Sequence, residues 1–586
     1  MNLSAISHRS LFTDCYAKNE KEVTLNIRTG KDVTAVNLMF DDPYAYGISG
    51  DIHWIGRELP MVLSRELKHH YIYSVTLAPE YRRLQYYFEI FSGEEKVLLF
   101  EDDFYTDESI EKPGRLKQYF KFPYLNKCDV ISPPEWVADT VWYQIMPDRF
   151  CRGGDHQRRM PQKSWEDRDA IGYEDFFGGD LRGIIQKLPY LQELGITGIY
   201  LLPVFESDTN HKYNIFDYTR IDPDFGTEED LIELVSTAHS LGIRVMLDAV
   251  FNHSGTAFFA WQDVWEKGER SQYFDWFCIH KTPFERKYAS LADGRFDGFA
   301  FLDNMPKLNT GNPEVAAYFE NICAHWVKDW GIDGIRFDVG NEVSHSFLKG
   351  LRRSLKQLNP DLFLLGEIWH DAAPWLMGDE YDSVMNYPFF ESMHNFWVDE
   401  NATSRDLMYA MERVYSLYPE QINRVLFNHL DTHDTMRSRN RCGSLDAFYH
   451  QQTMLMTLPG TVCIYYGTEI AMPGGHDPDC RKTMPWQKIE AGEYAAQQSI
   501  TKSLIALRKT YSQLREERIL WHHDAEHPRL VCYDRPGEQT LRVYLNNTNE
   551  EICVSGETVF AYRHESGKLL PGGIAITVFS CLQDFA

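Results

Sequence analysis

Three acidic residues of this sequence, Asp338, Glu367 and Asp434, each follow a short apolar stretch with the composition of a β-strand. A fourth, Asp248, lies near the end of a similar stretch. A single acidic residue at a strand end is more often a helix cap or half of a surface ion pair than a catalytic group. Several in series are hard to explain structurally, and a barrel enzyme needs them, because its catalytic groups come from the ends of different strands. The sequence therefore predicts an active site built on carboxyl groups.

Arg336 indicates how two of these carboxyls differ. It lies two residues before Asp338, so both side chains share one face of a strand, and a guanidinium holds a neighbouring carboxyl in its ionised form. Glu367 has apolar neighbours, which favour its protonated form. Hydrolysis of a glycosidic bond needs one ionised and one protonated carboxyl. We therefore predict that Asp338 is the nucleophile and Glu367 the general acid/base, roughly 5 Å apart, and that the anomeric configuration is retained.

Asp434 and two histidines complete the site that these patterns predict. Asp434 is expected to bind substrate hydroxyls and to stabilise positive charge at the anomeric carbon. His253 and His433 each lie beside a polar residue at a strand end. A lone histidine would more often be structural, but two on one barrel face suggest neutral imidazoles that hydrogen-bond to sugar hydroxyls. Neither belongs to a helical His-x-x-x-His pair, so no zinc site is predicted.

Residues 136–512 are predicted to form the barrel that positions these groups. Apolar strands alternate there with amphipathic helices, which is typical of a parallel sheet. Helices are expected over 228–241, after the N-cap residue Thr227, and over 313–330. Eight strands over this length indicate an α/β fold, a (β/α)8 TIM barrel, whose active site lies at the C-terminal ends of the strands. The predicted strands lie near 141–146, 198–203, 243–250, 334–338, 362–367, 382–386, 425–431 and 461–466.

Two β-rich regions flank the predicted barrel, and one long loop interrupts it. Residues 1–125 alternate apolar and polar side chains between turns, which predicts an N-terminal β-sandwich domain. Residues 516–586 return to the same alternation and predict a C-terminal antiparallel β-domain. Residues 254–311 are too many for an ordinary loop and are rich in aromatic side chains. We expect them to form an inserted subdomain beside the active site.

The composition argues against several classes of partner. The net charge is −27, from 59 basic and 86 acidic residues, which argues against nucleic acid and against an anionic membrane. The sequence has no recognisable signal peptide and no apolar run long enough to span a bilayer. Its eleven cysteines are scattered without Cys-x-x-Cys spacing. We therefore expect reduced thiols in a cytoplasmic protein.

Taken together, these motifs resemble those of the α-amylase family of glycoside hydrolases, in the stretches 248–253, 334–338, 366–369 and 433–434. Two more, 305–309 and 338–342, resemble the branch that holds cyclomaltodextrinase, neopullulanase and maltogenic amylase. The resemblance implies hydrolysis of α-1,4 and some α-1,6 bonds in cyclomaltodextrins, maltooligosaccharides and pullulan. It also implies a homodimer in which the N-terminal domain of one subunit closes over the barrel of the other.

The resemblance also implies roles for individual residues. It supports those of the three carboxyls and adds Arg336, His253 and His433 to the substrate site. Tyr213 matches the tyrosine that stacks on the sugar next to the cleaved bond. Phe299 and Trp369 match aromatic positions on either side of the cut. Asp248 matches a supporting carboxylate of the family.

The sequence departs from the family pattern at three places. Asn214 stands where relatives usually have Asp, so one carboxylate near the pocket is lost, and Gly340 replaces a usual Ala. Relatives often bind calcium through a loop rich in Asn and Asp, but here that loop contains Arg152, and Asp180 alone does not make a site. We therefore expect no metal and no cofactor.

Two other functions remain compatible with these residues. The same site would serve an enzyme that chiefly transfers glycosyl units to sugar acceptors, or an α-glucosidase that releases glucose. A non-catalytic binding protein with this fold is a more remote alternative, because such a protein would be expected to have lost at least one of the three carboxyls.

Overall fold

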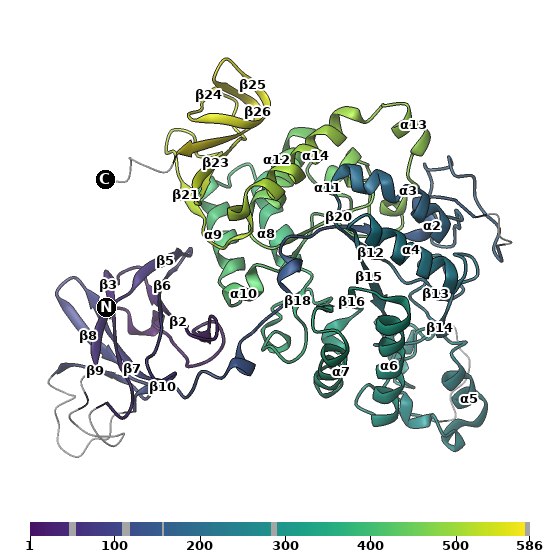
Figure 1. Ribbon diagram of the computed structural model, residues 1–586, viewed down its shortest axis with the longest axis horizontal. Helices are drawn as coiled ribbons and strands as arrows, with labels where there is room; N and C mark the ends of the chain where they lie inside the picture. The colour runs from purple at the N-terminus through teal and green to yellow at the C-terminus, as the bar shows by residue number, and fades with distance from the viewer. Residues whose placement is uncertain (46–53, 55, 108–117, 155–157, 283–289, 581–586) are drawn as a thin grey trace. The chain divides into compact units, whose positions relative to one another are not determined.

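The computed structural model describes residues 1–45, 54, 56–107, 118–154, 158–282 and 290–580 (Figure 1). The chain divides into two compact units. The first unit consists of Met1–Ser132 and Arg405–Asn423, and the second of Pro133–Ser404 and Arg424–Ala586. Each unit is described here by itself.

The first unit is built on two antiparallel sheets. One has the strand order β1 (Cys15–Ala17), β2 (Val23–Gly30), β6 (His70–Leu77), β5 (Val62–Glu66). The other has the order β4 (Arg57–Pro60), β3 (Ala35–Asp41), β7 (Leu84–Ser92), β8 (Glu95–Leu99), β9 (Phe104–Tyr105), and β10 (Phe120–Phe122) also pairs with β7. Alternating apolar residues of both sheets form one buried core, as the period-two pattern predicts. Helices α9 (Ser404–Tyr415) and α10 (Glu420–Asn423) also belong to this unit, except for the first residue of α9, Ser404. An ion pair of 2.8 Å between Arg65 and Glu412 joins α9 to the strands of this unit.

The second unit contains the predicted barrel. Its eight parallel strands follow one another in the order β18-β17-β16-β15-β12-β11-β20-β19. A parallel bridge between Met385 and Phe427 joins the two edges of this sheet and closes it. All eight strands lie within the predicted stretches, which confirms the α/β barrel. Their bounds are β11 (Val141–Ile145), β12 (Gly198–Leu201), β15 (Arg244–Ala249), β16 (Gly334–Phe337), β17 (Phe363–Gly366), β18 (Ser383–Val384), β19 (Phe427–Asn428) and β20 (Thr461–Tyr465).

Helices connect these strands and cover the outside of the barrel (Figure 1). Thr227 caps α4 (Glu228–Ser240) and forms a reciprocal capping box with Asp230. The helix expected over 313–330 is α6 (Pro313–His325) followed by a π-helical turn over Trp326–Trp330. The longer helices are α3 (Leu181–Leu194), α4 (Glu228–Ser240), α6 (Pro313–His325), α7 (His345–Leu358), α8 (Tyr387–Val398), α12 (Leu445–Thr457) and α14 (Ala495–Thr510). Among the residues that the structure describes, no helix has both the length and the apolar character needed to cross a membrane.

Two insertions, one short and one long, carry residues of the predicted site. After β12 the chain forms a hairpin of β13 (Phe205–Glu206) and β14 (Asp217–Ile221), and its loop contains Tyr213. After β15 the long insertion forms α5 (Phe259–Lys267) and several single turns. Trp261 of α5 is buried against Phe277 and Phe296, so these rings form the insertion's own core.

The C-terminal sheet packs on the barrel through helix α12. It consists of β21 (Leu520–His522), β22 (Leu530–Arg535), β23 (Gln539–Asn546), β24 (Ile552–Cys553), β25 (Glu557–Glu565) and β26 (Lys568–Ser580). His450 of α12 donates through Nε2 to the carbonyls of Gly572 and Gly573, at 3.1 and 3.2 Å. Its Nδ1 accepts from Trp397 Nε1 at 3.4 Å. Both ring nitrogens are therefore used by the neutral form of the imidazole.

We expect His450 to make the stability of this unit depend on pH. Burial lowers the pKa of His450 to about 4, whereas the unfolded chain takes up the proton near the ordinary value of 6.5. The unfolded state therefore binds more protons between these values, and the stabilisation is lost as pH falls from about 6.5 to about 4. At pH 5.5, unfolding of a His450→Gln variant should take up nearly one proton fewer than unfolding of the unmodified chain. Calorimetry in buffers of different ionisation enthalpy measures this number, and equal uptake by the two proteins would contradict the account.

Candidate active site

The ten predicted site residues belong to one continuous chain of contacts. At its centre is Arg336 of β16, which pairs in register with Asp248 of the neighbouring strand β15. Nη1 of Arg336 donates to both oxygens of Asp248, at 2.8 and 2.9 Å, and to Oδ1 of Asp338 at 2.9 Å. Nη2 lies 2.8 Å from Oε2 of Glu367. The guanidinium is completely buried, and the three acidic residues are at most 7% exposed. Neighbouring strands thus bring all four groups together.

This geometry corrects one sequence-based expectation. Arg336 contacts Glu367 as well as Asp338, so the guanidinium does not single out Asp338 as the ionised carboxyl. Burial raises the pKa of Asp338 well above its usual range, Arg336 opposes this rise, and the carboxylates of Glu367 and Asp248 add to it. One guanidinium is thus shared among three buried acidic side chains.

Two donors fix the orientation of Glu367. Its Oε1 accepts from Trp369 Nε1 at 3.0 Å, and its Oε2 accepts from the backbone N–H of Val339 at 2.9 Å. Val339 has φ +47°, a left-handed conformation that β-branched residues rarely adopt, at a cost of about 1–3 kcal/mol. The strained backbone after β16 therefore presents Asp338 and also supplies a donor to Glu367.

Asp248 binds protein groups on every side. Its Oδ2 accepts from the hydroxyls of Tyr200 and Tyr213, at 2.6 and 2.8 Å, in addition to Arg336. The ring of Tyr213 is parallel to that of His433, with 5.3 Å between centroids and 3° between planes. Asp248 therefore contributes to the site indirectly, because it holds Arg336 and Tyr213 in place.

The two predicted histidines are buried, and both ring nitrogens of each have protein partners. His253 donates through Nε2 to the carbonyl of Tyr213 at 3.1 Å and faces Asn252 through Nδ1 at 3.3 Å. Burial lowers the pKa of His253 to about 3, so the ring is neutral. His433 lies 3.0 Å from Gln144 and 3.1 Å from Asp434. A sugar hydroxyl that bound to either imidazole would therefore have to share a ring nitrogen with the protein group that already contacts it.

Asp434 and two aromatic rings form the more accessible part of the site. One third of the Asp434 side chain is exposed, and its Oδ1 lies 3.3 Å from Arg481 Nη2. Trp369 is 51% exposed and stacks on Tyr387 with 3.8 Å between centroids. Phe299 is 37% exposed and stacks on His253 with 5.1 Å between centroids. Exposed rings of this kind can receive the apolar face of a sugar.

Four residues at this site were not predicted. Tyr200 and Gln144 are polar groups in otherwise apolar barrel strands, and this pattern was available as a signal in the sequence. Tyr387 supports Trp369, and Arg481 contacts Asp434 and donates through Nε to the carbonyl of His433 at 2.9 Å. Arg481 is 47 residues from Asp434 along the chain, and no local pattern marks it.

The structure explains the amide at Asn214. Asn214 donates through Nδ2 to Asp208 at 2.7 Å, and its Oδ1 accepts from the hydroxyls of Ser207 and Thr209, at 3.2 and 2.6 Å. A carboxylate at this position would face the carboxylate of Asp208. The substitution therefore suits a loop in which an acidic neighbour is already present.

Protein donors occupy the oxygens of Asp180, the acidic residue considered above as part of a calcium loop. Asp180 accepts from the backbone N–H groups of Gly153, Gly154 and Gly183, and its Oδ2 also accepts from Arg158 Nη2 at 2.6 Å. Its oxygens are thus used by donors, whereas calcium needs several free oxygens. The part of the chain that the structure describes contains no cluster of three or more acidic, His or Cys side chains able to hold a metal. Asp155 of this loop lies outside the described residues.

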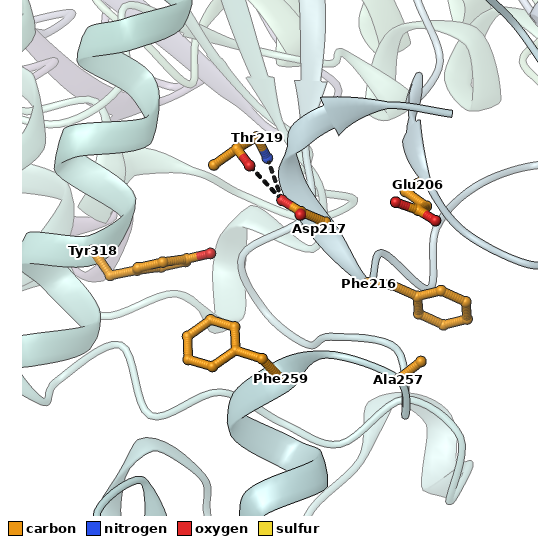
Figure 2. A pocket seen from close by; sticks show the side chains of 7 residues that line it. All are labelled: Glu206, Phe216, Asp217, Thr219, Ala257, Phe259 and Tyr318. Atoms are coloured by element: carbon orange, nitrogen blue, oxygen red, sulfur yellow. Dashed lines mark hydrogen bonds between the residues drawn. The ribbon is translucent and has the colours of Figure 1, made fainter. Parts of the chain in front are cut away.

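A separate pocket lies between residues of the two insertions, just after the Tyr213 loop and around the start of α5 (Figure 2). It has a volume of about 420 Å³, and none of the ten predicted residues lines it. Its wall contains Phe216 and Asp217, just after the Tyr213 loop, together with Phe259 of α5 and Tyr318 of α6. The pocket is therefore distinct from the carboxyls that are predicted to be catalytic.

Comparisons with known proteins show to which family the chain belongs. Residues 144–524 match the α-amylase catalytic domain, and residues 1–126 match the α-amylase N-terminal ig-like domain. The chain is 41% identical to a cyclomaltodextrinase of Geobacillus thermopakistaniensis (strain MAS1), covering 94% of this chain and 92% of the relative. It is 40% identical to an intracellular maltogenic amylase of Bacillus subtilis, with the same coverage.

Two further relatives extend the similarity to the whole chain. A neopullulanase 2 of Thermoactinomyces vulgaris is 36% identical over 97% of this chain and 94% of the relative. A solved structure of a cyclomaltodextrinase, 36% identical, superimposes with a TM-score of 0.89 over 98% of this chain and 100% of its own. Both the sequence and the architecture are thus shared over nearly the full length, and the chain belongs to the α-amylase family of glycoside hydrolases.

Proposed function

We propose that this chain hydrolyses α-1,4 bonds, and some α-1,6 bonds, in cyclomaltodextrins, maltooligosaccharides and pullulan, with retention of the anomeric configuration. The observation that carries the proposal is the meeting of Asp338 and Glu367 on the buried guanidinium of Arg336. The names of the relatives, which include cyclomaltodextrinase, maltogenic amylase and neopullulanase 2, support this class of substrate.

The proposed reaction has two displacement steps. In the first, Glu367 gives its proton to the glycosidic oxygen, while Asp338 attacks the anomeric carbon and forms a glycosyl ester. In the second, Glu367 takes a proton from water, which displaces Asp338 and restores both carboxyls. Asp434 binds substrate hydroxyls and, with its neighbours, stabilises the positive charge that develops at the anomeric carbon. A sugar acceptor in place of water would give glycosyl transfer by the same groups.

The assembly and the place of action are part of this proposal. We propose a homodimer that acts in the cytoplasm. Two Bacillus subtilis relatives with the name intracellular maltogenic amylase support the compartment, and the resemblance alone supports the dimer. Sedimentation equilibrium tests the assembly directly, and a mass of one chain at all concentrations would overturn it.

The proposed roles of the two carboxyls predict different responses to the leaving group. A Glu367→Ala variant should hydrolyse β-cyclodextrin at least about 10³-fold more slowly, because nothing protonates the leaving oxygen. It should still release a rapid burst of about one equivalent of fluoride from α-maltosyl fluoride, because fluoride leaves without a proton, whereas later turnovers should be slow because no carboxylate activates water for the second step. An Asp338→Ala variant should lose both reactions.

A matched control for these variants is Glu380→Ala. Glu380 is also a buried glutamate, but it pairs with His345 outside the proposed site. The control should keep both activities even if it loses stability. Equal loss of both reactions in Glu367→Ala, with its fold intact, would refute the role of Glu367 as acid.

We also propose that no calcium is needed at the Asp180 loop, because Arg158 supplies the cation. Dialysis against EDTA should leave the melting temperature of the unmodified chain unchanged. In an Arg158→Asn variant, which removes the cation and adds an oxygen ligand, added calcium should raise the melting temperature by several degrees. Thermal unfolding with and without calcium checks both results, and stoichiometric calcium in the dialysed protein would contradict them.

A further inference from the structure

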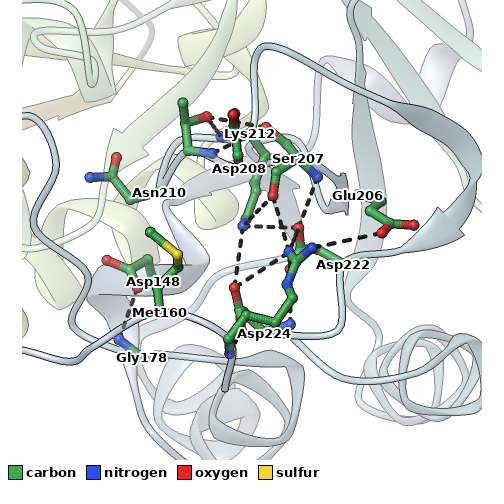
Figure 3. A network of polar contacts seen from close by, with 12 residues as sticks. Asp148, Met160, Gly178, Glu206, Ser207, Asp208, Asn210, Lys212, Asp222 and Asp224 are labelled. Carbon is green, nitrogen blue, oxygen red and sulfur yellow. Dashed lines mark hydrogen bonds and ion pairs between the residues drawn. The ribbon is translucent and has the colours of Figure 1, made fainter. Parts of the chain in front are cut away.

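Lys212, the residue before Tyr213, is held in an unusual way (Figure 3). Its side chain is buried, and Nζ lies 2.9 Å from Asp222 Oδ2 and 3.3 Å from the carbonyl of Ser207. Its backbone has φ +62°, a left-handed conformation that is uncommon for a residue other than glycine. A buried ammonium group and a left-handed backbone are each unfavourable, so other interactions must hold Lys212 in this conformation.

The carboxylate of Asp222 is the hub of the surrounding network. Besides Lys212, it accepts from Arg159 Nη2, at 2.7 Å to each oxygen, and from the backbone N–H groups of Ser207 and Asp224. The neighbouring Asp224 accepts from the backbone N–H of Arg159 at 2.6 Å. Two cations therefore pair with the buried carboxylate of Asp222: Lys212, which is itself buried, and Arg159, which is 38% exposed and also lies 3.7 Å from Glu206 (Figure 3). Removing one partner from such a group leaves an uncompensated buried charge.

This network fixes the loop that presents Tyr213. Ser207, at the start of the loop, is bound to Asp222 through its backbone and to Lys212 through its carbonyl. The next residue after Lys212 extends into the catalytic site, where the hydroxyl of Tyr213 donates to Asp248 and its ring stacks on His433. A change in the backbone of Lys212 would turn the Tyr213 side chain, because the two residues share a peptide unit.

We propose that Lys212, anchored on Asp222, is a positioning residue for Tyr213. It acts on the reaction only through the placement of the tyrosine ring and hydroxyl, and not through contact with substrate. The proposal rests on the proposed function, because it assigns Tyr213 to the glucan site. Without the ion pair, the left-handed backbone loses the interaction that holds it, and Tyr213 leaves its place against Asp248. A displacement of about 1 Å in an active site can cost about 100-fold in rate.

A double-mutant cycle tests this proposal on β-cyclodextrin. The Lys212→Met variant keeps the length of the side chain and removes its charge, and it should lower kcat/KM about 30-fold. Tyr213→Ala should lower kcat/KM at least as much. In the Tyr213→Ala background, Lys212→Met should change kcat/KM by less than about twofold, because the tyrosine that Lys212 positions is gone. Independent effects that multiply in the double variant would overturn the proposal.

The control is Lys356→Met, which removes another buried ion pair from the same unit. Lys356 of α7 lies 2.9 Å from Asp382, away from the Tyr213 loop. Its loss should lower the melting temperature, as Lys212→Met does, but kcat should stay within about twofold of the unmodified enzyme. An equal loss of kcat in both variants would show a general structural effect and would refute positioning. Lys212→Gln serves in the cycle if Lys212→Met fails to fold.

The cycle also separates this inference from the proposed function. If the unmodified chain does not turn over β-cyclodextrin, pullulan or soluble starch, the proposed function fails. If the unmodified chain is active and the cycle shows no coupling, only the positioning role fails.

Discussion

The guanidinium of Arg336 lies completely buried among carboxyl groups that come from three neighbouring strand ends. No other side chain offers five donors in a flat, permanently charged fork, so lysine could not make the same set of contacts. Because Arg336 touches Asp248, Asp338 and Glu367 at once, the spacing of the carboxyls depends on one side chain. The parallel sheet holds β15, β16 and β17 in the register that allows these contacts.

Protein cations stabilise the loops around this centre as well. Arg158 binds Asp180 at the start of α3, and the next residue, Arg159, binds Asp222 and Asp224. One short segment thus neutralises two separate acidic sites. Lys212 adds a second cation to the second site, and its pair with Asp222 is buried on both sides, so salt should screen that pair little. The proposed catalytic carboxyls and the loops around them are thus both held by pairs of opposite charge with a buried carboxylate.

Much of this arrangement was predictable from the sequence, because it depends on local patterns. Each barrel strand is an apolar run, and Asp338 and Glu367 follow such runs directly. The contacts that were not predictable join residues far apart in the chain. Glu367 meets Arg336 across the sheet, and Arg481 reaches Asp434 from a loop after the last strand. The segment 405–423, which the sequence assigns to the barrel, belongs by its contacts to the first unit, because partners such as Arg65 are hundreds of residues away. The predicted domain boundaries, site roles and dimer remain predictions.

The identity of the nucleophile is the central claim of this account, and covalent trapping tests it most directly. A Glu367→Gln variant, which cannot activate water for the second step, is mixed with α-maltosyl fluoride and quenched in acid. Proteolysis and mass spectrometry then locate the sugar ester. We predict a maltosyl group on the carboxyl of Asp338. A maltosyl group on Asp434, Asp248 or any other residue would contradict the account, as would fluoride release without any covalent intermediate on Asp338.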